Sequence, residues 1–370
     1  MLKKLIALVV CAVLLCGLLG CESRSENYND YDETTRAITT EESLAESTEP
    51  IELPPVKESF LVTPEFEIYS QAVYIVNLNT GIVIYAENEH EPLSPASTAK
   101  IMTALIVLEK VADLDEIVAI SSLCADEFWN LNFPNKYLEG IAAGIQPNQT
   151  NLTYRDCLYA LLLYSSNYAA NILAYNVGGK NFNAFDVFIK MMNDKAAELG
   201  CLNTNFTNPH GLYETLNYST VHDMYLITQF AYERYPIFSE ICATQVYNMP
   251  GNSDEPHGYP LTNTNMMINN ISSDNPYYCE FVKGIKTGSM PEYYLETSPG
   301  VFDTVNPMPG FTNLVSLATH NSLDYIIVSL GAPWHLRAER LEGEEAHHYT
   351  YIDHEMLYKW AFSTFDYQMA

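Results

Sequence analysis

A serine and a lysine three residues apart are the strongest candidates for chemistry in this chain. Ser97 and Lys100 lie in the stretch Ser94-Pro95-Ala96-Ser97-Thr98-Ala99-Lys100, and on a helix side chains at this spacing lie on the same face. A serine hydroxyl is a weak nucleophile until a base takes its proton. A lysine amine can be that base when burial or a second cation lowers its pKa. Ser-x-x-Lys also occurs on ordinary amphipathic helices, so the pair needs support from other motifs.

The element that must position this pair is a helix that begins near Ser97. Apolar side chains recur at helical spacing after it, at Met102, Leu105, Ile106 and Leu108. Ser94 and Pro95 are residue types that commonly start a helix. The free N–H groups at a helix N-terminus disfavour an ammonium and can hold an oxyanion. The start of this helix is therefore a suitable place for an activated serine.

A second motif, Tyr164-Ser165-Ser166-Asn167, follows a strongly apolar segment, 152–164. The spacing predicts a helix there, and the chain must turn where that helix ends. From such a turn Ser165 and Asn167 can point into a cleft and offer a hydroxyl relay and an amide.

The third motif, Lys286-Thr287-Gly288, ends a predicted strand that begins at Phe281. A strand edge offers backbone N–H groups to a bound peptide. Lys286 adds a fixed positive charge and Thr287 a hydroxyl, while Gly288 lets a second backbone approach closely. Each motif alone occurs by chance, but all three in this order, each on a suitable element, favour a single active site.

Together the motifs resemble those of the penicillin-recognising serine enzymes, which carry S-x-x-K, S-D-N-like and K-T-G sequences. More specifically, the chain resembles the D-alanyl-D-alanine carboxypeptidase family of low-molecular-mass penicillin-binding proteins, from about Ala72 to Leu330. The segments that carry the resemblance are 94–104, 158–163, Asn208-Pro209-His210-Gly211-Leu212, Tyr218-Ser219-Thr220 with Asp223, and 284–288. It implies removal of the terminal D-alanine from peptidoglycan stem peptides through an acyl-serine intermediate. It also implies β-lactams as covalent inhibitors and no metal or organic cofactor.

The resemblance also implies roles for single residues. Ser97 would be the nucleophile, Lys100 its base, and Ser165 the relay that carries a proton to the leaving amine. The backbone N–H groups of Ser97 and Ser289 would form the oxyanion hole, where one donor is typically worth about 3 kcal/mol of barrier.

Four positions would hold the substrate. Asn167 would bind its amide, and Lys286 and Thr287 would hold its terminal carboxylate, beside the close approach at Gly288.

The chain departs from the family in having Ser166 in the middle of its second motif, which we expect to have no catalytic role. It also has a long segment, 289–309, where relatives make a tight hairpin. This segment could cover the site, restrict substrates or block it.

Two alternative functions stay open. A β-lactamase would share the three motifs, but the class A type adds a glutamate that activates water, and no Glu-x-x-x-Asn-like segment follows soon after Asn167. A catalytically silent, wall-associated lipoprotein of the same fold would keep the architecture without the reaction.

Strand and helix signals outside the motifs predict the fold class. Strands are expected at 72–76, 82–87, 281–287, 314–319 and 325–330, and helices at 152–164, 168–177, 184–199, 219–232 and 352–365. Pro236 is expected to end the helix before it. Strands at both ends with helices between them predict an α+β fold. We expect one antiparallel sheet formed by the N- and C-terminal segments and flanked by helices, with an all-helical lobe.

The N-terminal segment predicts export. Residues 1–20 combine Lys3 and Lys4 with an apolar run, as a signal peptide does, and the end of that run resembles the lipobox of bacterial lipoproteins, with Cys21 as the lipidated residue. Residues 21–66 are acidic and lack apolar periodicity, which predicts a disordered tether, and 67–370 would be the catalytic domain. We therefore expect a protein attached by its lipid to the outer face of the bacterial cell membrane.

Charge and metal-ligating residues exclude other classes. The net charge of −28 over 370 residues argues against nucleic acid as a partner. An acidic and histidine-rich stretch lacks His-x-x-x-His spacing and predicts a polar surface loop, not a metal site: Glu344, Glu345, His347, His348, Asp353 and His354. His210 is expected to lie in a turn and not to be a catalytic base.

Overall fold

The computed structural model describes residues 63–125, 142–291, 296–298, 301–302, 308–334 and 348–365. All of them belong to the second of two units into which the chain divides, Glu52–Ala370. The predicted signal peptide (1–20), Cys21 and nearly all of the predicted tether (21–66) lie outside the described residues. Within the described part, no helix is both long and apolar enough to cross a bilayer.

A five-stranded sheet organises this unit, in the order β2-β1-β9-β8-β5, and every neighbouring pair is antiparallel. Its strands are β1 (Ala72–Asn77), β2 (Ile82–Glu87), β5 (Val282–Met290), β8 (Phe311–His320) and β9 (Leu323–Pro333). β1 thus pairs with β2 on one side and with β9, the last strand of the sheet in the sequence, on the other, so both ends of the chain contribute to one sheet, as the α+β prediction requires. Gly81 turns between β1 and β2 with φ 67°, a conformation that glycine adopts without strain.

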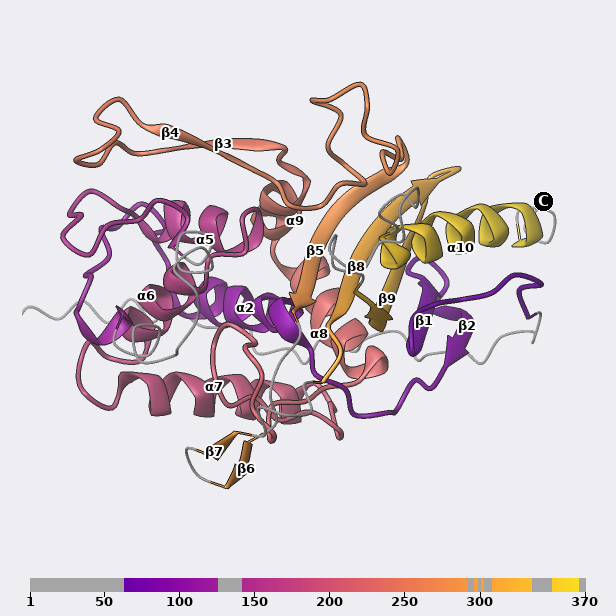
Figure 1. Cartoon of the computed structure of the whole chain (residues 1–370), viewed down its shortest axis with the longest axis horizontal. Coiled ribbons are helices and arrows are strands. Elements are labelled where there is room, and N and C mark those ends of the chain that lie inside the picture. Colours follow the sequence, from indigo (N-terminus) through magenta and orange to yellow (C-terminus); the bar gives the residue numbers. More distant parts are fainter. Residues whose placement is uncertain are drawn as a thin grey trace, which may run out of the picture. The chain divides into compact units, whose positions relative to one another are not determined.

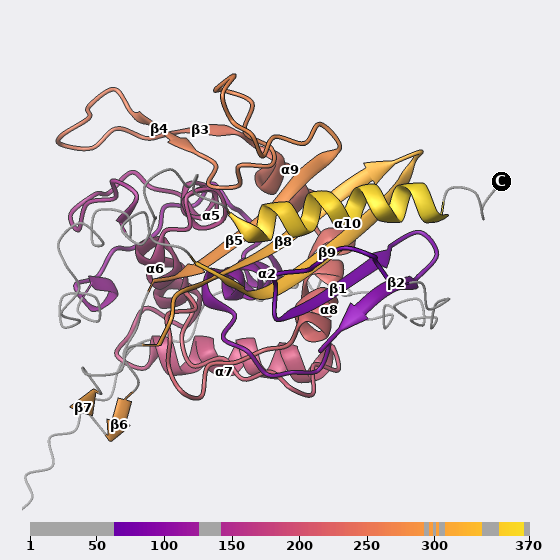
Figure 2. The same ribbon diagram turned by 45° about the vertical axis from the view of Figure 1, so that its right-hand side comes forward.

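Helices cover both faces of the sheet. On one side α10 (Tyr349–Phe365) lies across β8 and β9 (Figures 1 and 2). On the other side lies the helical lobe: α2 (Lys100–Lys110), α5 (Tyr154–Leu162), α6 (Asn167–Val177), α7 (Ala184–Glu198), α8 (Val221–Arg234) and α9 (Pro236–Ala243). Alternate residues of β1 serve the two faces, since Tyr74 packs in the lobe's core and Val73 and Ile75 pack in the α10 core. All of β1 is therefore buried.

Two helices of the lobe begin at clear capping residues. Thr153 and Asp156 form a capping box at the start of α5, and the Thr220 hydroxyl accepts a hydrogen bond from the Asp223 N–H at the start of α8. These caps explain why α5 and α8 each begin two residues later than the apolar spacing suggests.

Outside the segment 289–309, one helix and one hairpin were not predicted. Pro236 does follow the end of α8, but it also starts α9, because a proline fits the first turn of a helix, where its missing N–H needs no partner. β3 (Val246–Met249) and β4 (Tyr259–Thr262) form a hairpin whose sequence gives only a weak strand signal, because it is largely exposed and contains Pro260.

The insertion at 289–309 is described in part. β5 runs on to Met290, and β6 (Glu296–Ser298) pairs with β7 (Val301–Phe302) in a separate two-stranded sheet. Most other residues of the insertion lie outside the described part, so its proposed effect on the site stays a prediction.

Candidate active site

The candidate nucleophile stands in a tight turn that leads into α2. The turn is a 3₁₀ helix, η1 (Ala96–Ala99), in which side chains three residues apart eclipse each other, so Ser97 lies directly over Lys100. Ala96 has φ 44°, a left-handed conformation that costs energy in a residue other than glycine. The Thr98 hydroxyl donates to the Pro95 carbonyl over 2.6 Å and helps to hold this shape. The predicted helix is thus present, but its first turn is 3₁₀.

Lys100 has the surroundings of a base. Its Nζ lies 2.9 Å from Ser97 Oγ and donates to the carbonyl of His210 over 2.7 Å. The side chain is fully buried. Burial, and next the positive charge of Lys286, hold the pKa of Lys100 well below its usual range. This direction favours the neutral amine, whose lone pair can accept the serine proton.

The loop Asn208–Gly211 supplies the second partner of this amine, the His210 carbonyl. Gly211 has φ 84°, and a Cβ there would lie 1.8 Å from the Ala96 carbonyl oxygen. Asn208 Oδ1 accepts from the Gly211 N–H over 2.7 Å, and the Thr103 hydroxyl donates to the Pro209 carbonyl over 2.6 Å. Sequence reasoning predicted only a turn at His210. It missed the carbonyl of this residue, because a backbone acceptor leaves no signal in residue type.

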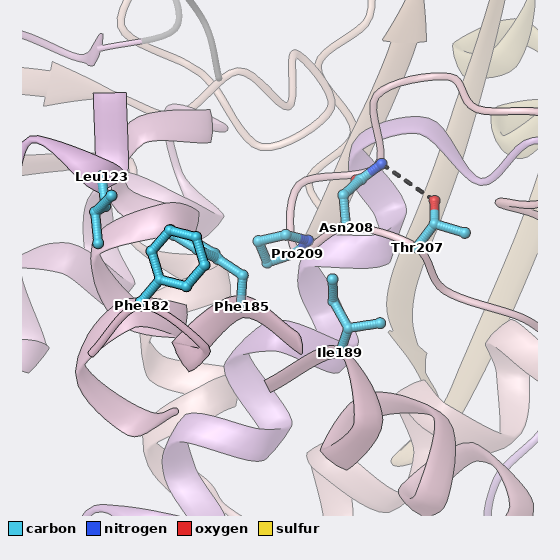
Figure 3. Close-up of a pocket in the computed structure, with 7 residues that line it drawn as sticks. All are labelled: Leu123, Phe182, Phe185, Ile189, Thr207, Asn208 and Pro209. Carbon is cyan, nitrogen blue, oxygen red and sulfur yellow. Dashed lines mark hydrogen bonds between the residues drawn. The ribbon is translucent and has the colours of Figure 1, made fainter. Parts of the chain in front are cut away.

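The outer side of this loop borders a pocket of about 290 Å³ (Figure 3). Its lining is mostly apolar and comes from Leu123, Phe182, Phe185, Ile189, Thr207, Asn208 and Pro209. Asn208 and Pro209 thus belong both to this lining and to the loop whose His210 carbonyl accepts from Lys100.

In the second motif the outer and middle residues behave differently. Ser165 has φ 68° and is half-buried at the turn between α5 and α6. Ser166 is buried, and its hydroxyl accepts from the Ala169 N–H over 3.1 Å as the cap of α6. Asn167 is the first residue of α6. The middle serine thus has a structural task as the N-terminal cap of α6.

The third motif lies on β5 beside the turn of the nucleophile. Lys286 is almost fully buried, and burial lowers its pKa to about 7. Its Nζ donates to the Thr287 carbonyl over 2.8 Å. The sequence predicted a fixed charge here. With this pKa the charge is only partial near neutral pH, because burial disfavours the ammonium form. Ser289 follows on the same strand and is exposed.

The structure brings the first and third motifs together. A Cβ on Gly288 would lie 3.2 Å from Thr98 Cγ2 and 3.3 Å from the Pro95 carbonyl oxygen. Asn313 of β8, which pairs with Gly288, donates from Nδ2 to the Ser94 carbonyl over 2.9 Å and accepts from the Gly331 N–H over 2.8 Å. β5 thus lies directly against the turn that carries Ser97.

Thr264 links the second and third motifs. Its N–H donates to the carbonyl of Leu163 at the end of α5, and its hydroxyl lies 2.7 Å from the Thr287 hydroxyl. Sequence reasoning missed both Asn313 and Thr264, because each acts through partners far away in the chain.

The acidic and histidine-rich stretch near the C-terminus lies partly on α10 and partly outside the described residues. Among the described residues, no group of His, Cys, Asp or Glu is arranged to hold a metal ion. The prediction of a surface loop is wrong for Asp353 and His354, which are buried on α10 because the helix begins before them. Asp353 accepts from the N–H groups of Tyr69 and Ser70. His354 lies between two serine hydroxyls, and burial lowers its pKa to about 3. Glu344, Glu345 and His347 lie outside the described residues.

Comparison with known proteins agrees with this geometry. The chain is 29% identical over 226 residues to the D-alanyl-D-alanine carboxypeptidase DacF of Bacillus subtilis, covering 61% of this chain and 52% of the relative. It is 32% identical over 202 residues to a D-alanyl-D-alanine endopeptidase of Escherichia coli, covering 55% of this chain and 59% of the relative. The chain therefore spans little more than half of the length of these relatives.

Solved structures show the same fold. The crystal structure of the Streptomyces K15 DD-transpeptidase matches with a TM-score of 0.63 at 25% identity, covering 81% of this chain and all of that one. A family model described as D-alanyl-D-alanine carboxypeptidase, peptidase family S11, matches residues 58–292, more than half of the chain. This protein therefore belongs to the D-alanyl-D-alanine carboxypeptidase family S11.

Proposed function

We propose that this protein is a serine-type D-Ala-D-Ala carboxypeptidase that removes the terminal D-alanine from peptidoglycan stem peptides. The observation that carries the proposal is the contact between the buried Nζ of Lys100 and Ser97 Oγ. An amine with a lowered pKa beside a half-exposed serine at the head of a helix is the arrangement that general-base activation needs.

Acylation begins when Ser97 Oγ attacks the carbonyl carbon of the penultimate D-alanine and its proton passes to Lys100 Nζ. The oxyanion forms beside the backbone N–H groups of Ser97 and Ser289. The bond from carbon to the nitrogen of the terminal D-alanine then breaks, and Ser165 relays a proton to that nitrogen. In deacylation, water attacks the ester carbon, the Ser97 Oγ takes back a proton, and the shortened peptide leaves.

Binding of the substrate's terminal carboxylate falls to Lys286 and Thr287, and Asn167 binds its amide. A carboxylate beside Lys286 favours the ammonium form of this residue and raises its pKa above the value of about 7 in the free protein. Substrate would therefore complete the charge of Lys286 on binding. Because β-lactams carry an acyl group and a carboxylate, they would acylate Ser97 and inhibit the enzyme.

Export is part of the same proposal. Residues 1–20 would be removed and Cys21 lipidated, which would hold the catalytic domain at the outer face of the membrane near its substrate. Mass spectrometry of the mature protein from a bacterial membrane fraction would test this, because a first residue other than lipidated Cys21 contradicts it.

The catalytic proposal is tested with diacetyl-Lys-D-Ala-D-Ala and with fluorescent penicillin. The wild type should release D-alanine and become labelled, and Ser97→Ala should lose at least about a thousandfold in release. Ser122→Ala, which alters an exposed serine, is the matched control and should behave as the wild type. Release that is unchanged in Ser97→Ala would refute the assignment. Rapid turnover of penicillin would indicate a β-lactamase, and a folded protein that is never labelled would indicate a silent member of the fold.

A further inference from the structure

A threonine outside the three motifs contacts the residue that is proposed to hold the substrate carboxylate. Thr264 follows β4, and its hydroxyl oxygen lies 2.7 Å from the hydroxyl oxygen of Thr287. Thr264 is exposed, whereas Asn263 and Asn265 on either side are buried. The backbone therefore presents this side chain outward, toward the edge of β5 along which a peptide would bind.

The backbone of Thr264 is fixed on two sides. Its N–H donates to the Leu163 carbonyl over 2.9 Å, and its carbonyl accepts from the Tyr351 hydroxyl of α10 over 3.2 Å. The Asn263 side chain donates to the Thr244 carbonyl over 2.9 Å and anchors the same segment to the end of α9. The Thr264 hydroxyl is therefore held at a defined place, and an ordered donor loses little entropy when a ligand arrives.

The chemistry of a carboxylate decides the direction of the hydrogen bonds. A carboxylate only accepts, so the Thr287 hydroxyl must turn its hydrogen toward the substrate. Its oxygen then still has lone pairs for a donor, and the Thr264 hydroxyl is placed to supply it. A hydroxyl that accepts one hydrogen bond becomes a better donor in the next.

We infer that Thr264 is a positioning residue for carboxylate recognition: its hydroxyl donates to Thr287 Oγ1 and aims the Thr287 O–H at the terminal carboxylate of the peptide. This inference rests on the proposed function. It assigns specificity for a free C-terminus to a pair of threonines from two separate segments. A peptide whose C-terminus is an amide offers no carboxylate, so Thr264 should not matter for it.

The experiment compares Thr264→Val, which keeps the shape but removes the donor, with Thr264→Ser, which keeps the donor. For diacetyl-Lys-D-Ala-D-Ala, the valine variant should raise KM about fivefold to tenfold with kcat nearly unchanged, whereas the serine variant should stay within about twofold of the wild type. For the same peptide ending in D-alanine amide, all three proteins should be equal. Both peptides are also measured as competitors of fluorescent-penicillin labelling, so that an uncleaved peptide still reports an affinity.

Thr262→Val is the matched control, because Thr262 is an exposed threonine on β4 two residues earlier. It should match the wild type with both peptides, and all variants should melt at the same temperature. Equal losses for acid and amide peptides would mean that Thr264 only supports the structure and would overturn the inference, as would a valine variant that equals the wild type with the acid. If the wild type neither releases D-alanine nor reacts with penicillin, the proposed function fails first and the inference fails with it.

Discussion

Replacing Gly211 with alanine would place a methyl group against the turn that carries the nucleophile. The new Cβ would lie 1.8 Å from the Ala96 carbonyl oxygen and 2.5 Å from its carbonyl carbon. Since contacts below 3.0 Å are essentially never tolerated, either the loop or the turn must move by about 1.2 Å, the difference between 3.0 and 1.8 Å. That movement separates Ser97 from Lys100 or Lys100 from the His210 carbonyl.

The chain offers a control for the backbone strain alone. Gly200 has φ 78°, close to the 84° of Gly211, but nothing lies within 4 Å of a Cβ built on it. Both alanine variants should lose about 1–2 kcal/mol of stability from the left-handed conformation. Only Gly211→Ala should also lose activity, by about a hundredfold, because a displacement of about 1 Å in reacting groups has an effect of this size.

The assay is the second-order rate of labelling by fluorescent penicillin, measured beside thermal unfolding. Gly211→Ala should label about a hundred times more slowly than Gly200→Ala at a temperature where both are folded. If the two variants label at the same rate, the loop Asn208–Gly211 does not hold Lys100 at its distance from Ser97, and the prediction is refuted.

Three other predictions concern stability. Burial lowers the pKa of Lys286 to about 7, so the unfolded chain binds more protons than the folded chain between about pH 7 and about pH 10. The free energy of unfolding should therefore rise with pH in this window. The contribution of Lys286 is up to about 1.4 kcal/mol per pH unit. Urea titrations at about pH 7.5 and about pH 9 should show a smaller rise for Lys286→Met, and an equal rise would contradict the burial argument. Asn313→Ala removes the partner of the Ser94 carbonyl and the Gly331 N–H, so it should cost about 1–3 kcal/mol in urea unfolding and slow penicillin labelling. Ser166→Ala removes the cap of α6 and should cost about 1 kcal/mol with little change in labelling; a large loss of labelling would instead give the middle serine a part in the reaction.

Local sequence signals predicted the elements whose residues pack in a regular pattern. The strand at Ile82–Glu87 was predicted with its observed bounds, and the antiparallel sheet joining both ends of the chain is confirmed. The 3₁₀ start of α2 was not foreseen, because its shape depends on Gly211, far along the chain, leaving room for the Ala96 carbonyl. Apolar periodicity describes which face is buried but contains no information about such a distant contact.

The active site likewise contains some residues that local spacing predicts and others that depend on distant contacts. Ser97 and Lys100 could be paired from their spacing, and their contact is observed. The position of the His210 carbonyl and the hydroxyl pair of Thr264 and Thr287 depends on tertiary contacts between distant segments. The lowered pKa of Lys286 was also missed, because a lysine on an otherwise mixed strand gives no sign that its amine will be buried.

The position of β1 between β2 and β9 has a consequence for newly made chains. Val73 pairs with Glu87 nearby and also with Ser329 near the other end, so the sheet cannot close until β9 has been synthesised. Before that moment the amine of Lys100 is hydrated and protonated like any lysine, and the serine beside it is inert. A chain truncated before β9 would therefore be unreactive toward penicillin from the outset, and reactivity would appear only once synthesis reaches the last strand.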